Sequence, residues 1–433
     1  MSARVFYILL ELLSLGYKLF TMRLSEQQRK KNLPEEVADI YDPERYQKYL
    51  SYVSDNRKMT LYSTAVELAV TAALIFSPVY GWIEQAVSGN PYLIFLLTAA
   101  LFLVVSEIIG LPFSWYDTFR IEEKYGLNKK DRKEFIKDET LDFAGNTILI
   151  SGLGMILVFI GEHMEKWTKG FSVGLLRAFL LGLLIAAVIA VFMFIAALFS
   201  LFMMRKKYTF TPLEDGELKD KIMQLQAGSR KQVRLIYVYN ESKKSTSKNA
   251  ALLKLLWHRE FWIADNFLNE NAEDELLAVL SHEIGHLKHK KNLLNYLQYA
   301  AMALVFLMFV LLIAYPAPVL SVLSWVRNSF GIMANNYYMI MTMTAAVFSP
   351  ISLIVGIFTN YRSREEEKEA DREAVQNGYG EALIRTFRKL SSDELINVNP
   401  HPLIEFLEYD HPGMYRRIKA IREAENAEGT GTP

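Results

Sequence analysis

Long apolar stretches are the feature that most limits what this chain can fold into. A helix of about 20 residues crosses the ~30 Å hydrocarbon core of a bilayer, and the run from Phe179 to Met204 contains no charged residue. Seven such stretches alternate with charged blocks, near residues 3–22, 61–84, 92–116, 142–162, 173–204, 293–323 and 335–360. The sequence therefore predicts a mainly α-helical, polytopic membrane protein with seven transmembrane helices.

The first stretch is the weakest, because Glu11 and Lys18 lie inside it. A cleaved signal peptide is the alternative. Its charged n-region would consist of Arg4 alone, and no clear small-residue cleavage site follows. We therefore expect a retained membrane anchor.

Positive charge in the connecting loops predicts the orientation, because cytoplasmic loops are enriched in Lys and Arg. These residues number eight and seven in the loops at 23–59 and 117–141, but zero, two and one in the loops after the second, fourth and sixth stretches. The alternation predicts an extracytoplasmic N-terminus and a cytoplasmic location for 205–292 and 361–433. The expected membrane is the bacterial inner membrane or that of the endoplasmic reticulum.

Composition excludes several other classes. The chain has 433 residues, of which 51% are hydrophobic and 22% charged, and this balance excludes intrinsic disorder. Lys and Arg total 48, as do Asp and Glu, so the zero net charge gives no basis for nucleic-acid binding. There is no cysteine, which rules out disulfides and cysteine-ligated metals.

The polar regions divide the chain into four parts. These are 1–204 with five transmembrane helices and two basic loops, a cytoplasmic α+β region at 205–292, helices six and seven at 293–360, and a cytoplasmic helical region at 361–433. Thr211-Pro212 predicts the start of a helix that runs to Leu225. The β-branched and aromatic run from Val233 to Tyr239 predicts a strand, and a second is expected near 261–264. A further helix is expected to begin near Ala272, where acidic residues favour a helix N-terminus.

That helix carries the motif His282-Glu283-Ile284-Gly285-His286. Histidines four residues apart share one helical face, so both imidazoles can bind one Zn²⁺ ion while the glutamate acts as a base. The alternative is a surface helix with two solvated histidines. Such a zinc enzyme needs a third protein ligand and one open position. His289 is left out, because a fourth protein ligand would close that position.

The third ligand is expected in the acidic run from Ser363 to Asp371. Two predicted spans separate this run from the histidines, so both lie on the same side of the membrane. A solvated acidic helix face is the alternative. Composition alone does not choose among Glu365, Glu366, Glu367 and Glu369.

These features resemble the type 1 CAAX prenyl proteases, which are seven-span integral-membrane zinc metalloproteases. The likeness covers nearly the whole chain. Besides the histidine motif, it rests on the segments Leu33–Tyr41, Ile121–Asn128, Pro212–Leu218, Asn399–Leu403 and Asp410–Pro412.

The resemblance implies roles for particular residues. The family pattern S-R-x-x-E-x-x-A-D, laid on Ser363 to Asp371, selects Glu367 as the third zinc ligand and Asp371 as the partner that orients a ligating histidine. Asn249-Ala250 matches a pair that binds the substrate backbone on a strand. His411 and Arg417 match groups near the oxyanion.

The resemblance further implies a water-filled chamber enclosed by the seven helices. We therefore expect a membrane zinc endopeptidase with one Zn²⁺ per chain, held by His282, His286 and Glu367, with Glu283 as general base and His411 beside the oxyanion. Its substrates would be C-terminal prenylated CAAX peptides or other membrane-associated proteins. A transporter and a proteolytically inactive membrane scaffold are the alternatives.

Overall fold

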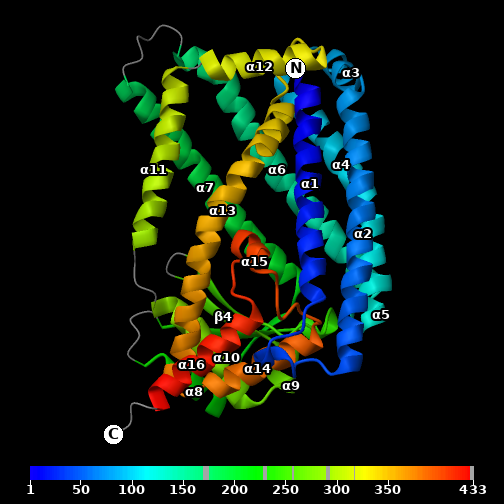
Figure 1. Cartoon of the computed structure of the whole chain (residues 1–433). Coiled ribbons are helices and arrows are strands. Elements are labelled where there is room, and N and C mark those ends of the chain that lie inside the picture. Colours follow the sequence, from blue (N-terminus) through cyan, green and yellow to red (C-terminus); the bar gives the residue numbers. More distant parts are fainter. Residues whose placement is uncertain (169–174, 228–231, 256–257, 289–292, 316, 430–433) are drawn as a thin grey trace.

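The computed structural model describes residues 1–168, 175–227, 232–255, 258–288, 293–315 and 317–429. Long helices form an upper bundle, and shorter helices surround one sheet in a lower region (Figure 1). The N-terminus lies at the top of the bundle, and the last described helix, α16 (Met414–Gly429), lies in the lower region (Figure 1). His289 lies outside the described residues.

Five helices of the described chain are long and apolar enough to cross a membrane. They correspond to the first five predicted stretches, of which the second continues past the end of its helix. The helices are α1 (Ala3–Arg29), α2 (Pro43–Phe76), α4 (Pro91–Tyr116), α6 (Arg132–Thr168) and α7 (Leu175–Lys207). The helix α4 continues through a π-helical segment (Asp117–Glu122) into α5 (Glu123–Tyr125). The prediction of a multi-pass, mainly helical membrane protein is therefore confirmed.

Two predicted stretches are not single helices. Within 61–84, α2 ends at Phe76 and α3 (Val79–Ala86) follows, because Pro78 drives Ser77 into an extended conformation. Within 293–323, α11 (Leu293–Ala314) is followed by α12 (Ala317–Phe330), bent by 77°. Pro318 lies in the first turn of α12, where proline is tolerated, whereas it would break a helix interior. The helix α12 lies across the top of the bundle (Figure 1).

The last long helix joins the two parts of the molecule. Helix α13 (Tyr337–Gln376) has 40 residues and descends from the top of the bundle into the lower region (Figure 1). The predicted stretch 335–360 corresponds to its N-terminal part, which begins at Tyr337. Its second half contains the acidic run, so apolar and acidic segments form one continuous helix.

The sheet of the lower region has the strand order β1-β2-β4-β3. Strands β2 and β4 are parallel, and both outer pairs are antiparallel. The predicted strands are confirmed as β2 and β4, whereas β3 was missed. The strands are β1 (Phe210–Pro212), β2 (Leu235–Tyr239), β3 (Ala250–Leu255) and β4 (His258–Ala264).

The predicted helix start at Thr211-Pro212 is wrong. These residues form the outer strand β1, where the missing amide hydrogen of Pro212 costs no ladder bond. The amide of Leu213 still donates to the carbonyl of Ile236, at 2.9 Å. The helix α8 begins only at Glu217 and runs to Leu225.

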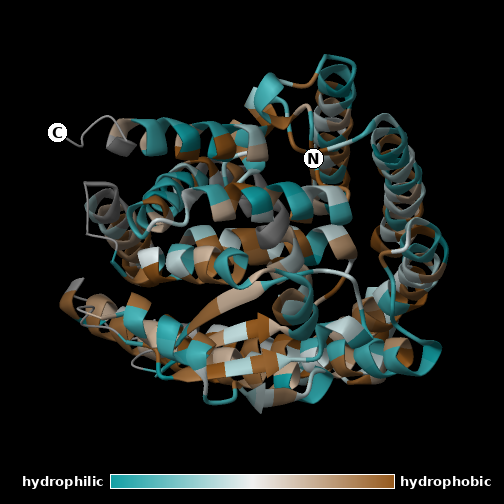
Figure 2. Ribbon diagram, turned by 90° about the horizontal axis from the view of Figure 1, so that it is seen from below, coloured by the Kyte–Doolittle hydropathy of each residue, from teal (hydrophilic) through white to brown (hydrophobic). Residues whose placement is uncertain are grey.

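Helix α10 (Glu273–Lys288) lies at the centre of the lower region, and the prediction of a helix near Ala272 is confirmed. Ile284 and Leu280 pack against the sheet, while Ala278 belongs to a second core with the C-terminal helices. A view from below shows hydrophilic and hydrophobic residues interspersed along the helices of the lower region (Figure 2). Such a pattern is expected of amphipathic helices that surround a core. The surrounding helices are α9 (Asp265–Glu270), α14 (Gly380–Asp393), α15 (Pro402–Glu408) and α16 (Met414–Gly429).

Candidate active site

The histidine motif lies on the buried helix α10. The first turn of this helix carries Glu273, Asp274 and Glu275, which interact favourably with the helix dipole. The carboxylate of Glu275 also accepts a hydrogen bond from the amide of Ala272, at 3.2 Å. These acidic residues therefore favour the start of the helix at Glu273, and the motif follows within the same helix.

Gly285, inside the motif, allows α13 to approach α10 closely. A Cβ atom at this position would lie 2.7 Å from the Cα atom of Ala370, a distance that real Cβ contacts essentially never show. Ala370 is itself small and fully buried. The close packing of these two residues places Glu367, almost one helical turn before Ala370, beside the histidines.

Two imidazoles and one carboxylate converge at this junction. Glu367 lies with Oε1 3.2 Å from Nε2 of His286 and with Oε2 3.4 Å from Nε2 of His282. The two Nε2 atoms are 3.2 Å apart, and the potential ligand atoms of the three residues all lie within 4.8 Å of one another. The structure therefore brings together the three residues that were predicted to bind zinc.

The donor set fits a divalent metal. The Oε2 atom of Glu367 is buried and lies 3.4 Å from both Nη2 of Arg417 and Nε2 of His282, but it accepts no hydrogen bond within the described part of the chain. Leaving a buried carboxylate oxygen without one is unfavourable, and coordination of a metal would satisfy it. Two histidine nitrogens and a carboxylate are a ligand set typical of catalytic zinc sites, which keep one further position open.

Asp371 lies behind His282. Its Oδ1 atom is 2.9 Å from Nδ1 of His282, so the Nε2 atom of the same ring faces Glu367. The guanidinium of Arg417, from α16, donates to both oxygens of Asp371, at 2.6 and 3.0 Å. Arg417 is buried, and its Cζ atom lies 4.1 Å from the ring centroid of Phe387. Asp371 thus connects the histidine to a fixed cation.

These contacts shift the pKa values of the buried groups. Burial opposes the charge on Asp371, but Arg417 and His282 outweigh it and hold the pKa of this carboxyl below its usual range. Burial also opposes the charge on His282, yet Asp371 and Glu367 raise the pKa of the imidazole to about 9. Metal binding at His282 would therefore displace a proton.

Glu283 and His411 are less buried than the ligands His282 and Glu367. Glu283 is half-buried on α10, next to His282. The side chain of His411 is 53% exposed, with Nε2 3.4 Å from Oε1 of Glu367 and Nδ1 2.8 Å from Asp410. The structure thus brings His411 to the predicted ligands from the loop between α15 and α16.

The predicted substrate-binding pair lies at the start of β3. Asn249 is exposed, and its carbonyl accepts from the amide of Ala264 at 2.9 Å. Ala250 is buried and pairs with Ile263. In the described residues β3 pairs only with β4, so its outer edge is unpaired. The side chain of Lys254 on β3 donates to the carbonyl of His286, at 3.0 Å, which places this strand beside α10.

Two contributors to the site were missed by the sequence analysis. Gly285 had a readable signal, because a glycine inside a helical pattern is unfavourable unless close packing requires it. Phe387 had no distinguishing signal beyond its place on an amphipathic helix, and only the fold brings it to Arg417.

A helix with a histidine pair and its glutamate, joined by a carboxylate from a membrane helix, defines a membrane metalloprotease. The comparisons with known proteins agree. A family model described as "CAAX prenyl protease N-terminal, five membrane helices" matches residues 23–204, and the model "Peptidase family M48" matches 212–425. The chain belongs to the CAAX prenyl protease branch of peptidase family M48, and it is a membrane zinc metalloprotease.

Its relatives match over nearly their whole length. The CAAX prenyl protease 1 homolog of Arabidopsis thaliana is 27% identical over 90% of both chains. CAAX prenyl protease 1 of Saccharomyces cerevisiae is 25% identical over 93% of this chain and 91% of its own. The crystal structure of S. mikatae Ste24p superposes with a TM-score of 0.76 at 23% identity, covering 97% of this chain and 99% of that one. The predicted family is therefore confirmed, and the transporter and scaffold alternatives are not favoured.

Proposed function

We propose that the chain hydrolyses peptide bonds with one zinc ion held by His282, His286 and Glu367. The observation that carries this proposal is the convergence of their ligand atoms within 4.8 Å around a buried carboxylate oxygen. Zinc, when bound, supplies a Lewis acid that polarises the scissile carbonyl and increases the acidity of water.

The residues of the chain handle the protons and the developing charge. Glu283 takes a proton from the attacking water and returns it to the leaving amine. Its half-buried position beside His282 leaves it accessible to substrate while limiting its solvation. His411 donates to the oxyanion from the exposed side of Glu367.

Asp371 and Arg417 position the ligands. Asp371 accepts from Nδ1 of His282, which fixes the tautomer in which Nε2 is free to bind metal. Arg417 was predicted to lie near the oxyanion. Its burial, its two bonds to Asp371 and the 3.4 Å contact of its Nη2 atom with Oε2 of Glu367 support a role in holding both carboxylates.

The substrate would add as an extra strand along the free edge of β3, contacting Asn249 and Ala250. Main-chain hydrogen bonds at such an edge bind extended peptides with little dependence on sequence. The relatives are named CAAX prenyl proteases. The proposed substrates are accordingly C-terminal CAAX peptides, prenylated or otherwise attached to the membrane.

We propose that the N-terminus is extracytoplasmic and that the zinc site faces the cytoplasm, at the endoplasmic reticulum or the bacterial inner membrane. Met1 and the lower region lie at opposite ends of the molecule (Figure 1), which supports this orientation. The positive charge of the predicted cytoplasmic loops supports it as well. The proposal includes seven spans around a water-filled chamber. It also keeps the division of the chain into 1–204, 205–292, 293–360 and 361–433.

Metal analysis and peptide cleavage on purified protein test the function. Wild type is expected to hold about one zinc per chain and to cleave a prenylated CAAX peptide. Glu283→Gln is expected to retain the zinc and lose cleavage. Absence of zinc from the wild type, or full cleavage by Glu283→Gln, would overturn the proposal.

A further inference from the structure

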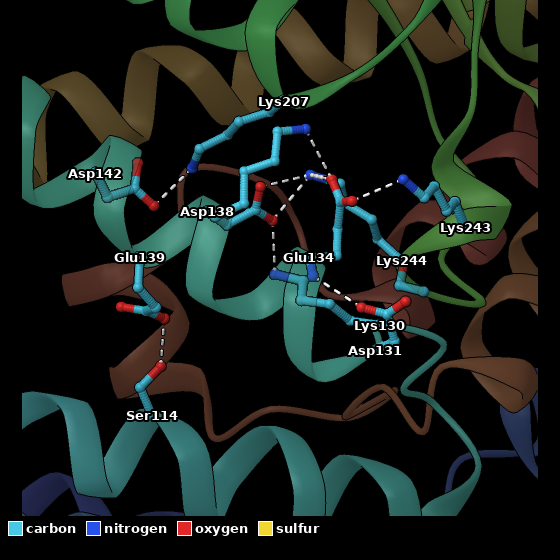
Figure 3. A network of polar contacts seen from close by, with 12 residues as sticks. Ser114, Lys130, Asp131, Glu134, Asp138, Glu139, Asp142, Lys207, Lys243 and Lys244 are labelled. Atoms are coloured by element: carbon cyan, nitrogen blue, oxygen red, sulfur yellow. Dashed lines mark hydrogen bonds and ion pairs between the residues drawn. The ribbon is translucent and has the colours of Figure 1, made fainter.

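A second buried charged cluster lies where α6 meets the segment that leads into β3. This lead-in segment comprises residues 240–249. Its Lys244 is only 4% exposed, and the Nζ atom contacts both carboxylate oxygens of Asp138 on α6, at 2.7 and 2.8 Å. The Nζ atom also lies 4.4 Å from the ring centroid of Tyr208. Figure 3 shows Lys244 and Asp138 pointing toward one another.

The acidic groups of α6 are paired from both sides. Asp138 also contacts Lys130 at 2.9 Å, and Glu134 contacts Lys243 at 2.7 Å and Lys244 at 3.4 Å. Unpaired, a buried charge is strongly unfavourable, so these residues hold one another in place. Removal of Lys244 alone would leave each carboxylate with another lysine.

The same helix is tied to its neighbours in the bundle. Ser114 on α4 donates to Glu139 at 2.7 Å, and Lys207 at the end of α7 contacts Asp142 at 2.6 Å. Figure 3 shows both contacts on the part of α6 that follows the cluster. The anchor of Lys244 is therefore a framework of three apolar helices rather than a loop.

Backbone and side-chain contacts fix the middle and the end of the lead-in segment. The carbonyl of Lys244 accepts from the amide of Lys129 at 3.0 Å, and the amide of Thr246 donates to Leu127 at 3.1 Å. At the end of the segment, Lys248 is buried and contacts Asp393 at 2.9 Å. The lead-in segment is therefore held at Lys244 and at Lys248, directly before Asn249.

We propose that the Lys244–Asp138 pair positions the substrate-binding edge of β3 relative to α10 and the membrane helices. Lys244 is thus a positioning residue, which acts on substrate binding and leaves zinc ligation and proton transfer to other residues. The inference rests on the proposed function. Its physical basis is that main-chain pairing with an added strand requires the edge at a fixed distance from the reacting groups.

The test compares Lys244→Met with Lys243→Met in the full-length protein. Lys243 is the matched control, because it lies in the same segment and contacts Glu134 but has a 53% exposed side chain. Steady-state cleavage of a prenylated CAAX peptide and zinc content would be measured. We expect Lys244→Met to raise KM by about tenfold or more, with kcat and zinc within about twofold of wild type. Lys243→Met should match the wild type, and Lys244→Arg should recover most of the affinity.

Two outcomes would overturn the inference: an unchanged KM in Lys244→Met, or an equal effect of Lys243→Met. A parallel loss of zinc and kcat would also overturn it, by showing a merely structural role. If Lys244→Met does not fold, Asp138→Asn decides the matter, since Lys244 then keeps Glu134 as a partner. Failure of the proposed function is distinguishable, because the wild type itself would then lack zinc or cleavage.

Discussion

The two buried charged clusters of this chain differ in how completely their atoms are satisfied. At the junction of α6 with the lead-in segment, Asp138 has both oxygens hydrogen-bonded to Lys244. At the junction of α10 and α13, Oε2 of Glu367 has ion-pair contacts of 3.4 Å with Arg417 and His282 but accepts no hydrogen bond in the described chain. A fully paired cluster fixes two elements against each other, whereas an incompletely paired one is suited to a ligand.

Glu367→Ala should abolish peptide cleavage and sharply lower zinc content, since it removes the carboxylate that faces both histidines. Zinc analysis and a cleavage assay measure both effects. Glu365→Ala, Glu366→Ala and Glu369→Ala are the controls on the same helix, and each should bind zinc nearly as wild type does. Full zinc occupancy in Glu367→Ala, with loss in one of the neighbours, would show that the ligand is misassigned.

Asp371→Ala should weaken zinc binding by about 10–100-fold without preventing it. The reason is that Asp371 orients His282 through Nδ1 but supplies none of the three converging ligand atoms. Competition with a chelator of known affinity measures the change. A zinc affinity equal to that of wild type would show that Asp371, held by Arg417, does not orient His282 for metal binding.

Gly285→Ala should destabilise the protein by about 1–3 kcal/mol, because the added Cβ would overlap the backbone of Ala370. The midpoint temperature of thermal unfolding and the zinc content would both fall. Gly356→Ala is the matched control on α13, where an added Cβ meets nothing within 4 Å. If both variants unfold like wild type, close packing of the two helices does not position Glu367.

Arg385→Ala should change stability by less than about 1 kcal/mol. Arg385 forms an ion pair with Asp274 near the start of α10, but both side chains are about half exposed, at 50% and 49%. Thermal unfolding is the measurement. A loss of stability as large as that in Gly285→Ala would contradict this expectation. It would mean that an exposed ion pair stabilises this protein as much as a buried contact does.

The local elements of the site could be predicted from the sequence. The acidic turn at Glu273 to Glu275 gave the start of α10, and the spacing of His282 and His286 gave their common face. Runs of β-branched and aromatic residues predicted β2 and β4. The breaks at Ser77 and Ala314 were missed, because the apolar pattern continues across the nearby prolines and hydropathy does not register the lost helix.

Contacts between distant residues could not be predicted in this way. The burial of Arg417 against Asp371 depends on how α16 packs on α13, and no local pattern encodes that packing. The resemblance to a known family selected Glu367, whereas composition left four glutamates equivalent. Strand β3 was missed because it lies at the edge of the sheet, where residues such as the half-buried Leu252 and the exposed Lys254 give a weak alternating pattern.

Anomalous diffraction at the zinc absorption edge tests the central claim most directly. A single strong peak per chain is expected, at about 2.0–2.2 Å from Nε2 of His282, Nε2 of His286 and a carboxylate oxygen of Glu367. A peak bound elsewhere, or none at this junction in active protein, would contradict it.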